Sequence, residues 1–169
     1  DGARYLAETT ERFDAILVDS TDPVGPAAAL IADAVLSDAR RALAPGGLMA
    51  MQSGSPLTQP RDWLATVGAF QRVFPIARPY LGWVPIYPGV LWSWVIGSEE
   101  VDPASIDDIT VQARLANMAE QPRVYNPGVH RAAFALPTFL QRLLERDSDQ
   151  PPSETELRAA GHPLPGVVA

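Results

Sequence analysis

Two carboxylates lie three residues apart in the segment Asp19-Ser-Thr-Asp22-Pro-Val-Gly-Pro26. This segment directly follows the apolar run 13–18, which is typical of a buried strand in a parallel sheet. Ligands of open α/β sheets bind just beyond the carboxyl ends of such strands, so both acids are expected at a binding site. Pro23 favours an extended backbone at Asp22 and stiffens the turn. A stiff acidic turn is suited to hold a cation and to accept a proton from it.

The composition excludes several kinds of chemistry. The chain has no cysteine, which excludes disulfides, thiolate metal sites and cysteine nucleophiles. All 13 basic residues are arginines, so a P-loop lysine and a lysine Schiff base are excluded as well. The net charge of −7 comes without a basic patch, which argues against nucleic-acid binding and favours a cationic small ligand. Acidity that only keeps the protein in solution is the alternative explanation.

Length and hydropathy predict one globular domain. The 169 residues, 47% of them hydrophobic, are enough to bury a core. A run of about 18 apolar residues and a charged-then-apolar leader are both lacking, so we expect no membrane span, no secretory signal and a cytoplasmic location. The domain is expected to cover residues 1–146, and residues 147–169 are expected to form a Pro-rich, flexible tail.

Apolar periodicity predicts alternating strands and helices. The expected strands lie near 15–18, 48–51, 76–84 and 90–96, and the expected helices near 30–43, 59–74, 103–120 and 136–146. We expect the first two strands to be parallel neighbours and the fourth to run antiparallel to them. The second strand ends at Gln52, so polar side chains again follow the carboxyl end of a strand. The pattern predicts an α/β fold with a mixed sheet.

The order of these elements, together with several short motifs, resembles the polyamine aminopropyltransferases, the family of spermidine and spermine synthases. The motifs are Asp1-Gly2, Phe13-Asp14, Asp19-Ser-Thr-Asp-Pro-Val-Gly-Pro26, Gly47-Leu-Met-Ala-Met-Gln52, Pro85-Ile-Tyr-Pro88 and Tyr125-Asn-Pro-Gly-Val-His-Arg-Ala-Ala-Phe-Ala-Leu-Pro137. They extend over most of the chain, and the acidic segment is highly specific. The resemblance implies the back half of the Rossmann-like fold of S-adenosylmethionine-dependent methyltransferases, with parallel strands that end in an antiparallel one.

The resemblance also implies roles for four residues on the side of the acceptor amine. Asp19 corresponds to the general base of the family, and Asp22 to the residue that holds the polyamine. Gln52 and Tyr87 correspond to groups that orient the attacking nitrogen. Each role has a structural alternative: Asp22 could shape an Asx turn, Tyr87 could be a packed hairpin aromatic, and Gln52 could be a hydrogen-bonding loop residue.

On the side of the aminopropyl donor, Asp1 corresponds to the family's adenine-binding aspartate, and Gly2 allows close approach of the backbone. The implied reaction transfers an aminopropyl group from decarboxylated S-adenosylmethionine, a co-substrate, to a diamine such as putrescine, giving spermidine and methylthioadenosine. The leaving group is neutral, so no metal and no tightly bound cofactor are expected. The amine has a pKa near ~10 and arrives protonated, so a carboxylate must attract it and remove one proton.

The chain departs from the family pattern at its beginning. Members carry a small β domain and a glycine-rich cofactor loop upstream of the segment that starts at Asp1. We therefore expect the isolated chain to be inactive, the edge of the strand near 15–18 to be exposed, and a complementary N-terminal chain or a homo-oligomer to be the partner. Two alternatives stay open: a small-molecule methyltransferase, and a non-catalytic polyamine-binding half that pairs with another chain.

The remaining conspicuous side chains are expected to be structural. His130 has no second metal ligand near it in the sequence and is kept out of the site. Trp63, Trp92 and Trp94 occur at helix or strand spacing and are expected in the core, whereas Trp83 could border the ligand pocket.

Overall fold

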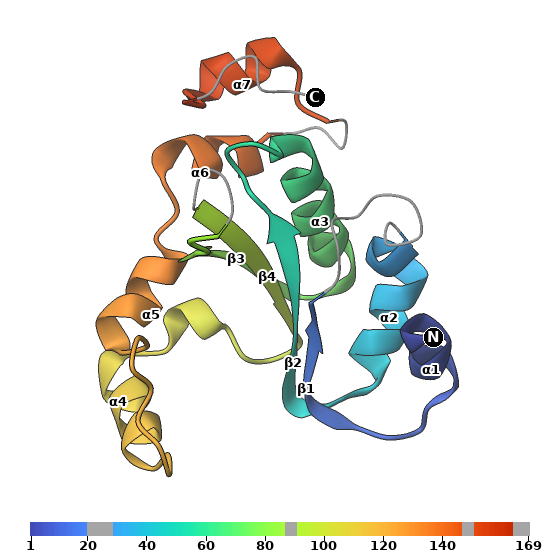
Figure 1. Ribbon diagram of the computed structural model, residues 1–169. Coiled ribbons are helices and arrows are strands. Elements are labelled where there is room, and N and C mark those ends of the chain that lie inside the picture. Colours follow the sequence, from blue (N-terminus) through green and yellow to red (C-terminus); the bar gives the residue numbers. More distant parts are fainter. Residues whose placement is uncertain (20–28, 87–90, 147–150, 164–169) are drawn as a thin grey trace.

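The computed structural model describes residues 1–19, 29–86, 91–146 and 151–163 (Figure 1). They build one four-stranded sheet from β1 (Phe13–Val18), β2 (Leu43–Gly54), β3 (Ile76–Trp83) and β4 (Leu91–Ser98). The spatial order is β1-β2-β4-β3, with β1 parallel to β2 and β4 antiparallel to both of its neighbours. The predicted α/β fold with a mixed sheet is confirmed. β4 follows β3 as a hairpin and is inserted between β2 and β3.

Helices lie on both faces of this sheet and at one end of it. They are α1 (Gly2–Glu8), α2 (Asp33–Arg41), α3 (Pro60–Val73), α4 (Asp108–Ala116), α5 (Pro127–Phe134), α6 (Thr138–Leu144), α7 (Glu154–Ala160) and the 3-10 turn η2 (Pro103–Ser105). The sequence does not predict α1, α5 or α7. The helix expected over 103–120 is divided into η2 and α4 because Asp107 starts a new helix, its carboxylate accepting from Thr110 N at 2.7 Å. Among the described residues, no helix is long and apolar enough to cross a membrane.

β2 begins earlier than the sequence predicts, at Leu43 instead of 48. Phe13 of β1 faces Leu43, but Ala15 faces Leu48, so β2 bulges between these two pairs. The bulge requires Gly47, because a Cβ there would lie 2.8 Å from the carbonyl oxygen of Phe13. Beyond the bulge the parallel register is regular up to the carboxyl ends of both strands.

α2 and α3 cover one face of the sheet and enclose the core. The β2 side chains Met49 and Met51 and the β4 side chain Val95 pack against Trp63 and Phe70 of α3, and all five are at most 1% exposed. Burial of each such side chain stabilises the fold by about 1.5–3 kcal/mol. The expectation that Trp63 belongs to the core is confirmed.

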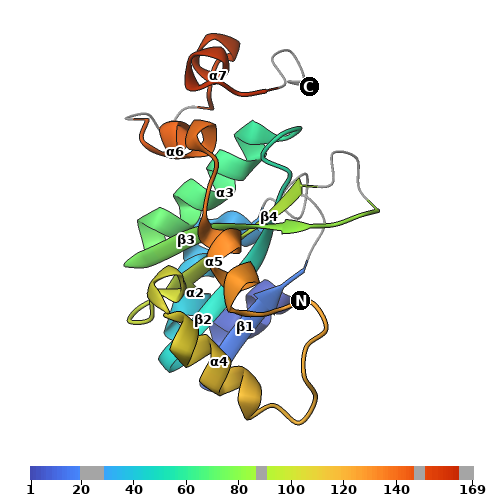
Figure 2. The same cartoon turned by 90° about the vertical axis from the view of Figure 1, so that its left-hand side faces the viewer.

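The opposite face of the sheet is covered by α5 over β3 and β4. Phe134 of α5 contacts Tyr80 of β3, with ring centroids 5.6 Å apart, and Tyr80 stacks on Trp94 of β4 at 5.5 Å. Gly82 leaves room for this stack, because a Cβ there would lie 2.7 Å from the indole ring of Trp94. Figure 2 shows α5 in front of the sheet and α2 behind it.

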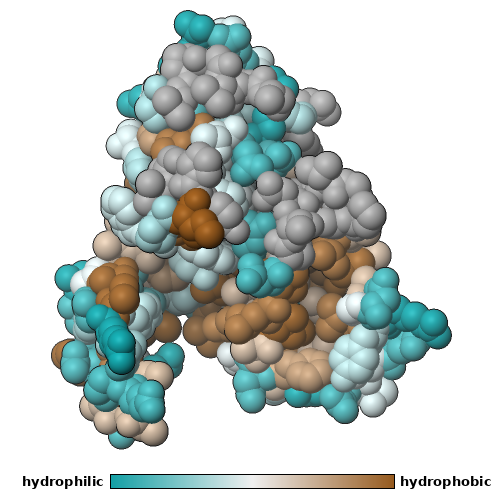
Figure 3. Space-filling view, viewed as in Figure 1, coloured by the Kyte–Doolittle hydropathy of each residue, from teal (hydrophilic) through white to brown (hydrophobic). Residues whose placement is uncertain are grey.

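Over β1 and β2 that same face stays uncovered by the described residues. The register places Ala15 beside Leu48 and Leu17 beside Ala50, all on the side away from α2 and α3; we call these four residues the open face. Leu17 is 75% exposed. Figure 3 shows apolar surface gathered over β1 and β2. β1 is also an edge strand of the described sheet, as expected from the sequence.

α6 and α7 lie at the end of the sheet where β2 ends (Figure 1). Ser153 and Glu156 form a capping box that starts α7, and Leu157 is completely buried in the core cluster. His162, next to the end of α7, donates from Nε2 to the carbonyl oxygen of Pro56 at 3.1 Å. Residues 151–163 therefore form a packed helical segment within the expected flexible tail, and the other residues of that tail lie outside the described residues. The domain boundary at residue 146 stays a prediction.

Leu157→Ala should lower the free energy of unfolding by about 2–5 kcal/mol, because it leaves a cavity under α7. The control is the same change at an exposed leucine, Leu17→Ala, which should cost less than about 1 kcal/mol. Urea unfolding of both variants measures the difference. Equal effects would show that α7 does not belong to the core.

Hydrogen bonds from the Ser153 hydroxyl and backbone, and then from Arg146, lower the pKa of Glu156 to about 2. A lowered pKa stabilises the fold above the ordinary value of 4.5, and this stabilisation is lost as the pH falls through about 2. An NMR titration of the Glu156 carboxyl should give the low value, and Ser153→Ala should raise it toward 4.5. A wild-type pKa near 4.5 would contradict these contacts.

Candidate active site

The parallel pairing of β1 with β2 brings two predicted site residues to the same edge of the sheet. Val18 and Met51 are the last paired residues of the two strands, and Asp19 and Gln52 follow them directly. Since side chains alternate along a strand, Gln52 points to the side of the sheet opposite to α2 and α3. Asp19 is exposed, and its carboxylate lies at the carboxyl end of β1, where α/β sheets bind ligands.

Gln52 is held firmly within this edge. It is only 6% exposed and pairs with Trp94 across the β2–β4 ladder. Its Oε1 accepts from the backbone N–H of Gly54 at 2.9 Å and from the indole Nε1–H of Trp92 at 3.0 Å. Trp92 is half-buried, and the sequence assigns it to the core only. Its contact with Gln52 cannot be seen in the periodicity of the sequence, because it depends on the register between β2 and β4.

A β-bulge fixes the backbone just after Gln52. The register between β2 and β4 shifts between Gln52 and Gly54, and Gly54 has a φ of +74°, which favours glycine. Ser93 donates from Oγ to the Gly54 carbonyl at 2.7 Å, so the 2.8 Å contact between the Ser53 and Ser93 hydroxyls has Ser53 as the donor. Both serines are buried, and their hydrogen bonds hold the bulge in place.

The Tyr125–Pro137 motif forms α5 and its attachment to the sheet. His130 is buried; its Nε2–H donates to the Pro103 carbonyl at 2.9 Å, and its Nδ1 accepts from the Tyr125 hydroxyl at 2.6 Å. Phe134 on the same helix reaches Tyr80, whose pKa is raised by burial and, to a lesser extent, by Tyr125. These contacts agree with a structural role for His130.

The two predicted nucleoside-binding residues lie at the start of α1. Asp1 caps this helix, its Oδ1 accepting from Arg4 N at 3.0 Å, and it is exposed. A carboxylate has two oxygens, so capping leaves Oδ2 with capacity to accept from an adenine amino group. A Cβ at Gly2 would meet nothing within 4 Å, so no described neighbour requires glycine there.

Two other predicted site residues, Asp22 and Tyr87, lie outside the described residues. Trp83, which the sequence places near the pocket, is 80% exposed at the end of β3. The described part of the chain brings together no group of three or more histidine, aspartate or glutamate side chains that could hold a metal ion.

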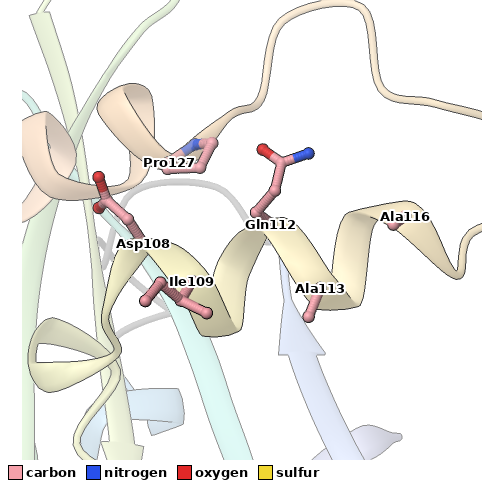
Figure 4. Close-up of a pocket in the computed structure, with 6 residues that line it drawn as sticks. All are labelled: Asp108, Ile109, Gln112, Ala113, Ala116 and Pro127. Carbon is pink, nitrogen blue, oxygen red and sulfur yellow. The ribbon is translucent and has the colours of Figure 1, made fainter.

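A shallow pocket of about 560 Å³ lies elsewhere, on α4 and the start of α5 (Figure 4). Asp108, Ile109, Gln112 and Pro127 are among its lining residues, and Ile109 is 80% exposed. None of the sequence-predicted site residues lines it. This pocket is therefore separate from the edge that carries Asp19 and Gln52.

Comparison with known proteins identifies relatives over most of the chain. Residues 1–107 match the spermine/spermidine synthase domain. A polyamine aminopropyltransferase from Caldicellulosiruptor saccharolyticus is 40% identical over 146 residues, which are 86% of this chain and 50% of the relative. One from Ruegeria sp. is 41% identical over 143 residues, with 85% of this chain and 50% of the relative covered. The chain thus spans about half the length of these relatives.

Solved structures show the same relationship. A crystal structure of spermidine synthase in complex with the transition state analogue AdoDATO matches with a TM-score of 0.76 and 31% identity, over 85% of this chain and 48% of that one. Spermidine synthase from Thermotoga maritima matches with a TM-score of 0.73 and 31% identity, over 85% and 47%. The motifs, the mixed sheet and these matches agree, and the chain belongs to the spermine/spermidine synthase family of polyamine aminopropyltransferases.

Proposed function

We propose that this chain supplies the amine side of an active site that transfers an aminopropyl group from decarboxylated S-adenosylmethionine to a diamine such as putrescine. The observation that supports the proposal is the register of β1 on β2, which ends with Val18 opposite Met51, so that Asp19 and Gln52 follow the last paired residues at the carboxyl edge of a sheet from this family. The products are spermidine and methylthioadenosine. The spermidine synthase solved with AdoDATO supports a sulfonium nucleotide as the donor.

In the proposed reaction the attacking amine nitrogen forms a bond to the aminopropyl carbon while the bond from that carbon to sulfur breaks. The sulfonium becomes neutral methylthioadenosine, and the amine must lose a proton. Asp19 attracts the ammonium and accepts this proton, and Asp22 holds the polyamine. Alignment of the two reactants supplies a proximity effect that can reach about 7–11 kcal/mol. Tyr87 and Gln52 contribute to this alignment.

On the donor side, Asp1 accepts from the adenine amino group with the carboxylate oxygen that does not cap α1. The exposure of Asp1 and the open space around Gly2 support this role. The rest of the nucleotide needs further binding groups. We assign these to the portion that the relatives carry and this chain does not match, since the matches cover about half of each relative.

The open face is the proposed contact for that further portion. Leu17 is 75% exposed within it, although it lies on a strand between apolar neighbours, and β1 offers an unpaired edge among the described residues. An apolar face beside an unpaired strand edge is a template for another chain segment. A strand and a helix from the complementary portion would bury both.

A non-catalytic polyamine-binding half is a second candidate, for which the exposed Asp19 carboxylate at the carboxyl end of β1 would be the binding group. It predicts polyamine binding by the chain without turnover, even when the complementary portion is supplied. Methyltransferase activity is less favoured, because the matched relatives are named aminopropyltransferases. Methylthioadenosine release therefore tests the proposal directly.

The role of Asp19 is tested in a chimera that joins this chain to the unmatched portion of the C. saccharolyticus relative. Asp19→Asn should lower kcat by about 100-fold or more, because the base is lost. Asp22→Asn should also raise the KM for putrescine, because an ion pair with the amine is lost. Methylthioadenosine release measures both. If both variants keep the rate of the parent chimera, neither acid takes part in the reaction.

The need for a second portion is tested by comparing the chimera with the isolated chain. The 169-residue chain should show no detectable methylthioadenosine release and only weak spermidine binding by calorimetry, whereas the chimera should turn over putrescine. Leu17→Asp should reduce turnover of the chimera, because it places a charge in the buried contact. Robust turnover by the isolated chain would overturn the proposed contact.

A further inference from the structure

Trp92 and Gly54 together saturate Oε1 of Gln52 with hydrogen bonds. A carbonyl oxygen has two lone pairs, and Oε1 of Gln52 accepts two hydrogen bonds, at 2.9 Å from Gly54 N and at 3.0 Å from Trp92 Nε1. Both donors can only donate. A flipped amide would direct its own N–H groups at these two donors, so the contacts fix which way the Gln52 amide points.

The surroundings keep both donors in place. The Gly54 N–H belongs to the bulge, which is held by the buried hydroxyls of Ser53 and Ser93. The Trp92 indole extends from the same face of β4 as Trp94, which stacks on Tyr80. The amide of Gln52 is therefore oriented by donors from two neighbouring strands, β2 and β4.

We propose that Trp92 is a positioning residue that holds Gln52 as a hydrogen-bond donor at the amine site. This inference rests on the proposed function and deepens it. An ammonium group has only donors, so it finds no acceptor on a Gln52 amide whose Oε1 is saturated. The carboxylates of the acidic turn bind the ammonium groups of the diamine. Gln52 donates to an oxygen acceptor, for which we propose the Asp19 carboxylate, because Asp19 and Gln52 directly follow the last β1–β2 pair, Val18 and Met51.

The first test uses the isolated chain and needs no turnover. The four tryptophans give four indole N–H signals in a ¹H–¹⁵N spectrum, and Trp92→Phe identifies the signal of Trp92. In Gln52→Leu that signal should move upfield and exchange with solvent at least tenfold faster, because its acceptor is lost, while the signal of Trp63 stays in place. An unchanged Trp92 signal would show that the indole does not hold Gln52.

The second test separates a donor from an acceptor in the chimera. Gln52→Glu keeps an oxygen for Trp92 and Gly54 but replaces the donating NH₂ by an accepting oxygen. Its kcat/KM for putrescine should fall about tenfold or more. An unchanged or higher kcat/KM would mean that Gln52 accepts from the amine, and the proposal would be wrong.

Trp92→Phe keeps an aromatic ring and removes the N–H donor together with the rest of the pyrrole ring. It should lower kcat about tenfold, with the KM for putrescine changed less than threefold and the melting temperature nearly unchanged, because the amide is released but the carboxylates still bind the amine. The matched control is Trp94→Phe, which alters packing on the same face and should leave kcat within threefold. Equal effects of both changes on kcat would indicate packing alone.

Failure of the proposed function gives a different pattern. If the parent chimera releases no methylthioadenosine, the proposed function fails, while the indole signal of Trp92 still reports whether Gln52 is held. If the chimera is active and Trp92→Phe retains full kcat, the proposed function stands and the positioning role of Trp92 is overturned.

Discussion

The parallel pairing of β1 with β2 is the constraint on which the rest of the site depends. It ends with Val18 opposite Met51, and a shift of one residue would turn the side chains of one of the two strands to the other face of the sheet. The register is fixed at its other end by the bulge at Gly47, where no side chain fits. Core packing holds it in between, because Met49 and Met51 must face α3. The lack of space for a side chain at Gly47 thus helps to determine which residues reach the carboxyl edge of the sheet.

The antiparallel strand β4 also contributes residues to this edge of the sheet. Parallel strands bring their carboxyl ends to the edge, but β4 brings its amino end, Leu91–Ser93. Residues that stabilise the sheet therefore also reach the site, as Trp92 does through its indole and Ser93 through the bulge.

The sequence predicts the strands and their directions well, because apolar runs and Gly–Pro punctuation carry that information locally. Asp19 directly follows β1, as the sequence predicts, whereas β2 continues past Gln52 to Gly54. The sequence misses α7, whose stability comes from Leu157 packing against residues far away in the sequence. It misses the contact of Trp92 with Gln52 for a similar reason: the two are 40 residues apart, and only the β2–β4 register brings them together.

The hydrogen bond from His162 to Pro56 joins residues 106 positions apart in the chain. Such a contact closes a long loop. The entropic cost of closing it is smaller once the intervening sheet has formed. On the ribosome, every strand of the sheet emerges before α7 does. The nascent sheet must therefore persist for a time without Leu157 packed in its core. A chain shortened before α7 would remain in that incomplete state.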